Sequence, residues 1–236
     1  MKIMSFNTQH CLNYLEKKID FDLMARVIRE SGSLIVGLNE MRGAGDVPDY
    51  TDQVGKLSAL SGLKYHYFAK AIDVGGKNAP YGNGLLSSYP IESAETIPVP
   101  DPAVEERVNK RGYYESRCLL KARLSCGLTV LVIHFGLNPD EQKNAVDTVI
   151  ANLEEEKCIL MGDFNLFPDN PLLEPIRTRM KDAAECFDGE KNSFPSDKPD
   201  RKIDYIFVTP DLHLLSADIP PIVASDHRPH TAEINI

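Results

Sequence analysis

Residues 159–165 read Ile159-Leu160-Met161-Gly162-Asp163-Phe164-Asn165, an apolar run that ends in a glycine and two polar side chains. The apolar run predicts a buried β-strand, and the glycine marks its junction with a loop. Side chains at i and i+2 of an extended chain point the same way, so Asp163 and Asn165 should face one point. We therefore expect a functional site at the end of this strand, because rigid scaffolds commonly hold functional groups on loops there.

Polar side chains border other apolar segments in the same way. They are Asn7 at the end of 2–7, Glu40 after 34–39, His134 near the end of 128–135, Asp204 within 203–208, and Asp226 with His227 before 231–236. Taken singly, each is explained by a turn, a helix cap or a buried histidine. Taken together, their carboxylate and amide oxygens are the ligands that Mg²⁺ prefers, and the histidines can serve in proton transfer. Zn²⁺ is not favoured, because it would need Cys and His at tighter spacing.

The order of the predicted elements indicates the fold class. The expected strands are 2–7, 34–39, 64–71, 84–88, 117–124, 128–135, 158–161, 203–208, 213–217 and 231–236, and the expected helices are 20–31, 139–153 and, more weakly, 51–61. Surface loops are expected at 41–50, 73–81, 98–112 and 187–202. Because the chain shows no repeat and no long linker, we predict a single α/β domain over 1–236, with two packed sheets flanked by helices.

Charge and composition exclude several function classes. The chain carries 26 Lys and Arg against 35 Asp and Glu, a net charge of −9. This balance counts against a non-specific nucleic-acid binder, which usually presents a basic face. The 5 cysteines show no CxxC spacing, which disfavours a zinc knuckle or a thioredoxin-type motif. No apolar run approaches the roughly 18 residues of a membrane span, and the N-terminus reads as a strand, so we expect a cytoplasmic protein unless a leader has been removed.

Short motifs along the whole chain make the sequence similar to a known family. In order they are Phe6-Asn7, Asn39-Glu40, Gly82-Asn83-Gly84-Leu85-Leu86-Ser87, Ile133-His134, Gly162-Asp163-Phe164-Asn165, Ile203-Asp204-Tyr205 and Ser225-Asp226-His227-Arg228-Pro229. This ordered set resembles the endonuclease/exonuclease/phosphatase superfamily, which has the DNase I-like fold. The resemblance implies a four-layer α/β sandwich of two mostly antiparallel or mixed sheets flanked by helices. It also implies Mg²⁺ or Mn²⁺ as cofactor and hydrolysis of phosphoester bonds.

The same resemblance implies catalytic roles for five side chains. Asp163 would orient or deprotonate the attacking water, and Asn165 would hold the phosphate or the metal shell. His227 would stabilise the pentavalent phosphate, and Asp204 would orient the His227 ring. His134 would assist the leaving group.

Three side chains are implied as metal ligands. Glu40 would be the principal ligand, Asn7 would lie beside it, and Asp226 would serve a second site or support the first. The motifs do not determine whether one or two metals bind.

The segment 107–123 and two isolated residues complete the expected site. Six basic residues stand there against the single acid Glu115, which is either a solvated strand face or a substrate-binding patch. Glu115-Ser116-Arg117 resembles an acid-x-Arg element of small bacterial members, which favours Arg117 as a contact to substrate phosphate. In some nuclease branches a glutamate pairs with the histidine at the His134 position, but Asn83 stands there in this chain. Either His134 is oriented differently or Glu115 takes this part. We expect His10 in the cleft, and we predict Asn83, Glu115 and His10, together with Arg117, as substrate-binding residues.

We therefore predict a divalent-metal-dependent phosphodiesterase that attacks its substrate in line with water. The substrate would be nucleic acid or a related phosphodiester, although the net charge does not strongly indicate nucleic acid, and no obligate protein partner is inferred. A sphingomyelinase-like enzyme or a phosphomonoester hydrolase of the same fold is the alternative. A non-catalytic binding module is disfavoured, because the acids and His227 of the motifs are all retained.

Overall fold

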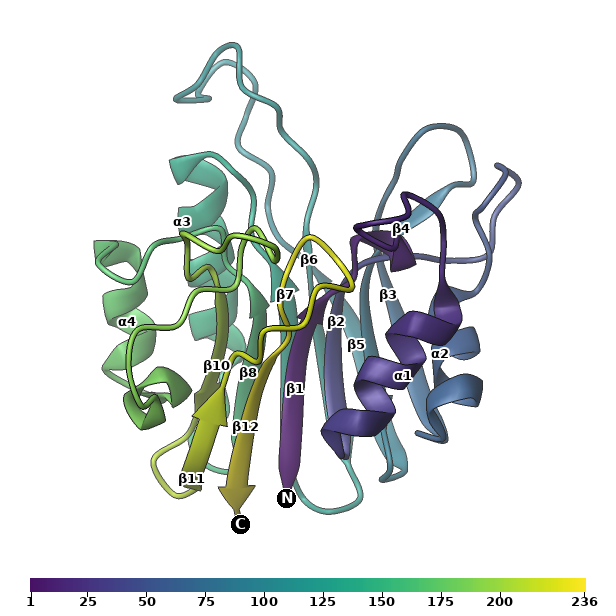
Figure 1. Cartoon of the computed structure of the whole chain (residues 1–236). Helices are drawn as coiled ribbons and strands as arrows, with labels where there is room; N and C mark the ends of the chain where they lie inside the picture. Colours follow the sequence, from purple (N-terminus) through teal and green to yellow (C-terminus); the bar gives the residue numbers. More distant parts are fainter.

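Two six-stranded β-sheets lie face to face in the computed structural model, which describes residues 1–236 (Figure 1). The first has the order β11-β12-β1-β2-β4-β3, and the second has the order β5-β6-β7-β8-β10-β9. The first sheet contains β1 (Lys2–Asn7), β2 (Ile35–Arg42), β3 (Tyr65–Asp73), β4 (Pro80–Ser87), β11 (His213–Asp218) and β12 (His230–Asn235). The second contains β5 (Ile91–Pro98), β6 (Cys118–Leu124), β7 (Thr129–His134), β8 (Cys158–Asp163), β9 (Lys181–Asp182) and β10 (Asp204–Val208).

Helices cover the outer face of each sheet. Figure 1 shows α1 (Phe21–Ser31) and α2 (Gln53–Ser61) on one side, and α3 (Pro139–Asn152) and α4 (Glu174–Arg177) on the other. The short helices η1 (Gln9–Cys11), η2 (Pro171–Leu173) and η3 (Ala183–Cys186) lie in connections. Helix α1 begins where the Asp20 carboxylate accepts the backbone N–H of Leu23, and it ends at Gly32 with a φ of 70°. None of the helices has the length and apolar character needed to cross a membrane.

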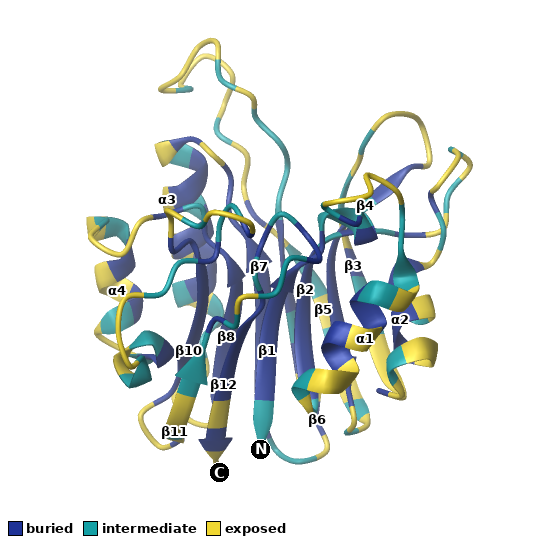
Figure 2. Cartoon of the chain, viewed as in Figure 1, coloured by how far each residue is buried: buried dark blue, intermediate teal, exposed yellow.

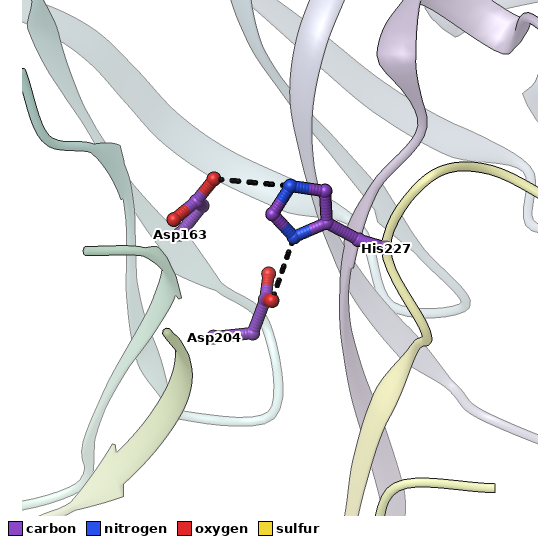
Figure 3. A group of neighbouring side chains, drawn as sticks. All are labelled: Asp163, Asp204 and His227. Atoms are coloured by element: carbon purple, nitrogen blue, oxygen red, sulfur yellow. Dashed lines mark hydrogen bonds and ion pairs between the residues drawn. The ribbon is translucent and has the colours of Figure 1, made fainter. Parts of the chain in front are cut away.

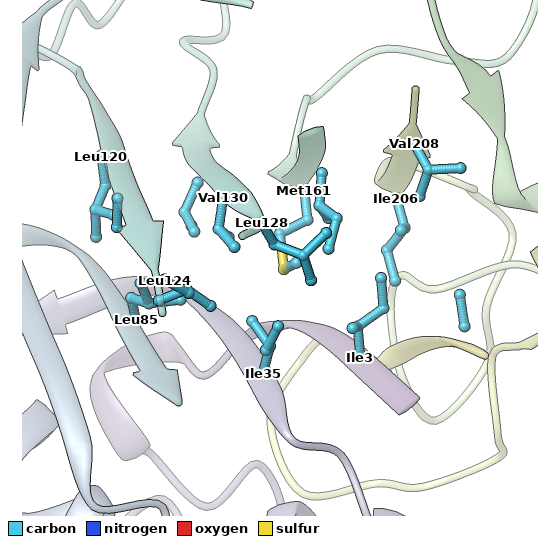
Figure 4. Packing of buried hydrophobic residues seen from close by; sticks show 14 of the residues in the cluster. Ile3, Ile35, Leu85, Leu120, Leu124, Leu128, Val130, Met161, Ile206 and Val208 are labelled. Atoms are coloured by element: carbon cyan, nitrogen blue, oxygen red, sulfur yellow. The ribbon is translucent and has the colours of Figure 1, made fainter. Parts of the chain in front are cut away.

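Three apolar cores separate the four layers. The central core packs side chains such as Ile3 and Ile35 of the first sheet against Val130, Met161 and Ile206 of the second (Figure 4). One outer core lies between the first sheet and α1 and α2, and the other lies between the second sheet and α3 and α4. Figure 2 shows the resulting buried strands between helices with exposed outer faces. The predicted four-layer α/β sandwich is therefore confirmed.

The main differences from the expected elements are two unexpected edge strands, β5 and β9, and an earlier start of the interior strand β4. Strand β5 was not expected, because as an edge strand it has exposed residues such as Glu92, Ser93 and Glu95, which have low β-propensity. The two-residue strand β9 is too short to leave a pattern. Strand β4 begins at Pro80, inside the expected loop 73–81, because pairing with β3 and β2 extends it beyond its apolar part.

Strand direction brings the predicted site residues to one edge of the molecule. β1 runs parallel to β2, with Asn7 beside Asn39, and β7 runs parallel to β8, with His134 beside Asp163. β10 runs antiparallel to β8 and begins at Asp204, which lies opposite Asp163. The carboxyl ends of four strands and the amino end of a fifth therefore meet at the top of Figure 1.

Gly162 allows β7 and β8 to approach each other at this edge. Its φ is 151°, and a Cβ added there would lie 1.8 Å from the backbone oxygen of Ile133. Any side chain would therefore push the backbones apart next to Asp163.

We expect Gly162→Ala to destabilise the protein by about 3 kcal/mol or more, since the clash is with backbone and cannot be relieved by a rotamer change. Gly127→Ala is the matched control, because Gly127 has a φ of 87° but nothing within 4 Å of an added Cβ. That control should lose only about 1–2 kcal/mol from its left-handed backbone. Urea unfolding of both variants checks this, and equal losses would show that backbone conformation, not close approach, requires Gly162.

Candidate active site

A cavity of about 420 Å³ opens at the strand-end edge where the predicted residues meet. It is lined by Glu40, Tyr81, Tyr113, Glu115, Arg117, His134, Leu137, Asp163, Asn165, Phe194, Arg201, Ile203, Asp226 and His227. Most of the predicted site residues therefore face one space. Asn7 and Asp204 lie directly behind it, through hydrogen bonds to Asp163 and His227 respectively.

The deepest part of the site is a buried group of two carboxylates and one imidazole (Figure 3). The Nδ1 atom of His227 lies 2.8 Å from Asp204 Oδ2, and its Nε2 atom lies 3.6 Å from Asp163 Oδ2. Burial lowers the pKa of His227, but the carboxylates of Asp204 and Asp163 outweigh burial and raise the pKa above its ordinary value. The ring is therefore a buried imidazolium held between two acids.

Asp163 is fixed by hydrogen bonds from both sheets. Its backbone N–H donates to Asn39 Oδ1 at 3.0 Å, its Oδ2 accepts from the Asn7 amide at 3.0 Å, and its Oδ1 accepts from the backbone N–H of Asn165 at 3.0 Å. Burial raises the pKa of the Asp163 carboxyl, the charge of Asp204 raises it further, and the His227 imidazolium opposes both. Asp163 can therefore take up a proton more readily than an exposed aspartate.

The Asn7 amide joins Glu40 to Asp163. Its Nδ2 donates to Glu40 Oε1 and to Asp163 Oδ2, both at 3.0 Å, while its Oδ1 accepts from the backbone N–H of Gln9. In this arrangement Asn7 presents its NH₂ group, and not its oxygen, to the acids. The metal-ligand role expected for Asn7 remains a prediction.

Two residues of the site have left-handed backbone. Glu40 has a φ of 62° at an irregular point of β2, between its pairings at Leu38 and Met41, and Asn165 has a φ of 50° directly after β8. Such values are unfavourable for a glutamate and persist only when the surroundings impose them. At both positions, one inside β2 and one after β8, a polar side chain lines the cavity.

The Glu40 side of the cavity carries negative charge that no Lys or Arg side chain pairs with. Burial raises the pKa of Glu40 and the charge of Asp226 raises it further, while the Asn7 amide and the charge of His227 lower it. Neither carboxylate forms an ion pair with a Lys or Arg side chain. A divalent cation held by Glu40 and Asp226 would complement this charge, and the oxygen donors are those that Mg²⁺ or Mn²⁺ prefers. Asp163, Asp204 and His227 also offer ligand atoms within 4.8 Å of one another and could bind a metal, but that group already contains the imidazolium charge.

His134 has Arg117 as its partner on one side. Arg117 Nη1 lies 3.0 Å from His134 Nδ1, and Glu115 Oε1 lies 2.6 Å from the same guanidinium nitrogen. Asn83 does not contact His134, because its amide donates to the Cys118 backbone oxygen and accepts from Asn39. The sequence left open whether His134 is oriented differently or Glu115 is its acidic partner. In the structure Glu115 acts on His134 indirectly, because Arg117 lies between them.

His10 lies outside the residues that line the cavity. It belongs to η1, a run of three left-handed residues after β1, where its backbone oxygen accepts from Gln53. Burial lowers the pKa of His10 to about 4, with a further contribution from Arg42. The predicted substrate contacts of His10 and Asn83 are not tested by this placement and remain predictions.

The sequence analysis missed Phe194 and Arg201, which form one lip of the cavity. They pair across a short β-bridge, with both backbone N–H groups donating to the partner's oxygen at 3.0 Å. The Phe194 ring packs 4.7 Å from the His227 ring, and the Arg201 guanidinium lies 5.2 Å from the Phe194 ring. Segment 187–202 has the composition of an ordinary polar loop. Its position just before Asp204 is the only sequence feature that indicates a place near the site.

Sequence comparison identifies the relatives of this chain. Residues 4–227 match the sequence model of a family described as the Endonuclease/Exonuclease/phosphatase family. Among curated proteins, no sequence matches the chain.

Solved structures share its fold at low identity. An endonuclease/exonuclease/phosphatase from Beutenbergia cavernae is 20% identical, with a TM-score of 0.79, and the match covers 100% of this chain and 71% of that one. A mannosyl-6-phosphatase from Bacteroides thetaiotaomicron is 13% identical, with a TM-score of 0.76 and 100% of both chains covered. A 3′ phosphatase from Neisseria bound to a product DNA hairpin is 15% identical, with a TM-score of 0.66 and 100% of both chains covered. At these identities the structures support the fold and leave the substrate open.

We expect Glu40→Gln to stabilise the metal-free protein by about 0.5–2 kcal/mol, because it removes a partly desolvated charge that repels Asp226 and keeps an oxygen for the Asn7 amide. Thermal unfolding in EDTA measures this, and added Mg²⁺ should stabilise the unsubstituted protein more than the variant. Glu95→Gln, at an exposed position of β5, is the control and should change stability little. A lower melting temperature of Glu40→Gln in EDTA would contradict the charge argument.

Proposed function

The chain belongs to the endonuclease/exonuclease/phosphatase family, and from this premise we propose that it is a divalent-metal-dependent phosphodiesterase acting by in-line attack of water. Members of the family are hydrolases that act on phosphoester bonds. One observation carries the proposal. A single cavity contains His227, whose pKa is raised by its carboxylate neighbours, and two carboxylates, Glu40 and Asp226, that form no ion pair with a Lys or Arg side chain.

We assign separate roles in hydrolysis to the residues around the cavity. Glu40 and Asp226 would hold the divalent cation, which would act as a Lewis acid and neutralise charge on the phosphate oxygens. Asp163 accepts a proton from the attacking water, since burial raises its pKa toward neutrality. His227 donates hydrogen bonds and positive charge to the pentavalent phosphate, and Asp204 keeps the ring oriented and protonated.

The positive charge of the site favours a diester over a monoester. Two guanidinium groups line the cavity, and Arg117 already contacts Glu115 and His134. Arg201 forms an ion pair only with the adjacent exposed Asp200, and such a surface pair is weak in water. Arg201 is therefore the guanidinium available to the substrate. A phosphodiester carries one negative charge, whereas a monoester approaches two at neutral pH. His227, Arg201 and the proposed divalent cation only balance the four carboxylates Glu40, Asp163, Asp204 and Asp226, so the site has no excess positive charge for a dianion and accommodates a monoanion better.

A phosphomonoester or sphingomyelinase-like hydrolase is the alternative. Two of the similar folds carry phosphatase names, and the same water activation would serve a monoester. Nucleic acid is one candidate diester, although the net charge of −9 gives no general attraction to it.

A substrate panel tests the proposal. Bis(4-nitrophenyl) phosphate and 4-nitrophenyl phosphate are compared at equal concentration with Mg²⁺, with Mn²⁺ and with EDTA. We expect turnover of the diester to exceed that of the monoester and to vanish in EDTA. Preference for the monoester would favour the alternative, and turnover that survives EDTA would overturn the metal dependence.

We expect Asp163→Asn and His227→Ala each to lower kcat by about 10²–10³ with little change in KM, because both act mainly on the transition state. Asp204→Asn should be milder, since it acts through His227. The double variant Asp204→Asn with His227→Ala should lose little more than His227→Ala alone, because residues that act as a unit are not additive. Steady-state kinetics on one diester measure all four, and fully multiplicative losses would remove the orienting role of Asp204.

We expect Arg201→Met to raise KM about 10- to 100-fold and to leave kcat nearly unchanged, because a charge-assisted contact to ground-state phosphate contributes about 1.5–3 kcal/mol. Arg26→Met, at an exposed position of α1, is the matched control and should leave both constants unchanged. An unchanged KM in Arg201→Met would show that this lip does not contact the substrate.

A further inference from the structure

The hydrogen bond between Arg117 and His134 determines where the imidazole carries its proton. Arg117 Nη1 lies 3.0 Å from His134 Nδ1, and both side chains are about nine-tenths buried. A guanidinium is always protonated and can only donate. Nδ1 must therefore accept with its lone pair, which leaves the ring neutral with its proton on Nε2.

We propose that Glu115 and Arg117 are positioning residues that hold His134 in the neutral Nε2–H form, so that His134 donates a hydrogen bond to the substrate phosphate and is not the acid that protonates the leaving group. This inference rests on the proposed function for its kinetic part only. It replaces the direct phosphate contact expected for Arg117 from the sequence.

Glu115 holds the guanidinium in this position. Its Oε1 lies 2.6 Å from Arg117 Nη1, and its Oε2 accepts the Tyr113 hydroxyl at 2.8 Å. The backbone N–H of Glu115 donates to Glu141 at the start of α3. The ion pair is nearly buried, with 10% exposure on each side chain, so solvent screens it weakly. Arg117 is thus held on the ring by a residue that is itself anchored.

The other ring nitrogen faces the reacting groups. His134 Nε2 lies 3.5 Å from Asp163 Oδ2, which can accept its proton. The Asn165 Nδ2 atom, 3.3 Å away, is a donor and so is no partner for an Nε2–H group, and it donates instead to the Phe135 backbone oxygen. Asp163 alone would attract a second proton to the ring, but Arg117 and the His227 imidazolium repel it, and burial disfavours the charge. These causes, burial first, hold the pKa of His134 well below its ordinary value. The geometry and the local charge therefore agree on a neutral ring.

A neutral His134 restricts how the reaction handles protons. The water oxygen forms the new bond to phosphorus, a water proton passes to Asp163, and the bond to the leaving oxygen breaks with its electron pair on that oxygen. Loss of the Nε2 proton would leave an imidazolate, so the leaving oxygen takes its proton from solvent water and not from His134. The contribution of His134 is then a hydrogen bond that strengthens as charge develops on the phosphate.

Nitrogen NMR tests the proton position without any substrate. The full chain is labelled with ¹⁵N-histidine in EDTA near neutral pH, and the His134 signals are assigned by their absence in His134→Gln. We expect wild-type Nδ1 to be unprotonated and Nε2 to be protonated. Arg117→Lys should keep this pattern because a donor remains, whereas Arg117→Met should place a proton on Nδ1. A protonated Nδ1 in the wild type, or an unchanged pattern in folded Arg117→Met, would overturn the proposal.

Kinetics on a phosphodiester separate positioning from direct binding. Arg117→Met should lower kcat about 10-fold with KM nearly unchanged, Arg117→Lys should recover most of the rate, and Glu115→Gln should fall between them. Arg123→Met, at the exposed end of β6, is the matched control and should keep wild-type constants. A rise in KM alone in Arg117→Met would overturn the proposal in favour of direct phosphate binding. If the wild type turns over no phosphoester, the proposed function fails, while the NMR result still decides the proton position.

Discussion

The buried amide of Asn39 joins the two sheets at the edge where the cavity lies. From β2 in the first sheet, its Oδ1 accepts the backbone N–H of Asp163 in β8, and its Nδ2 donates to the Ile133 oxygen in β7. Both contacts are to backbone of the second sheet, so they fix how far the sheets slide past each other. Glu40 follows Asn39 directly, and Asp163 is one of its partners. The distance between the proposed cation site and the proposed base thus depends on one side chain that touches no substrate.

Charged side chains of both signs line the cavity, and their burial strengthens the electrostatic interactions between them. The His227 imidazolium lies between Asp163 and Asp204 and offsets one of their two negative charges. Glu40 and Asp226 form no ion pair with a Lys or Arg side chain, while Glu115 is neutralised by Arg117. In a low-dielectric site such unpaired charge is unfavourable without a ligand. The cavity is therefore arranged to gain most from a divalent cation, whose charge would in turn attract the substrate phosphate.

Sequence reasoning located the site because strand direction and side-chain alternation are local properties. Asp163 and Asn165 follow an apolar run, and the parallel pairing of β7 with β8 places His134 beside them. The same reasoning could not predict which side chains contact each other. The position of Arg117 in the sequence does not indicate a contact with His134, because that contact depends on where the loop before β6 lies. The Phe194 and Arg201 lip depends likewise on a bridge inside a polar loop, and β5 on an edge strand with little apolar pattern.

Both sheets contribute residues to the cavity, so the distances between these residues depend on how the sheets pack in the core below. Glu40 comes from the first sheet and Asp163 from the second, while His227 precedes β12 of the first sheet and bonds to Asp204 of the second. Between the sheets the fit is tight, because a Cβ on Gly37 of β2 would lie 2.6 Å from the Met161 sulfur of β8. Close-packed layers transmit small displacements instead of absorbing them. A larger side chain at Gly37 would therefore separate β2, which carries Glu40, from β8, which ends in Asp163. It would act on the reaction through the spacing of the sheets without touching the cavity.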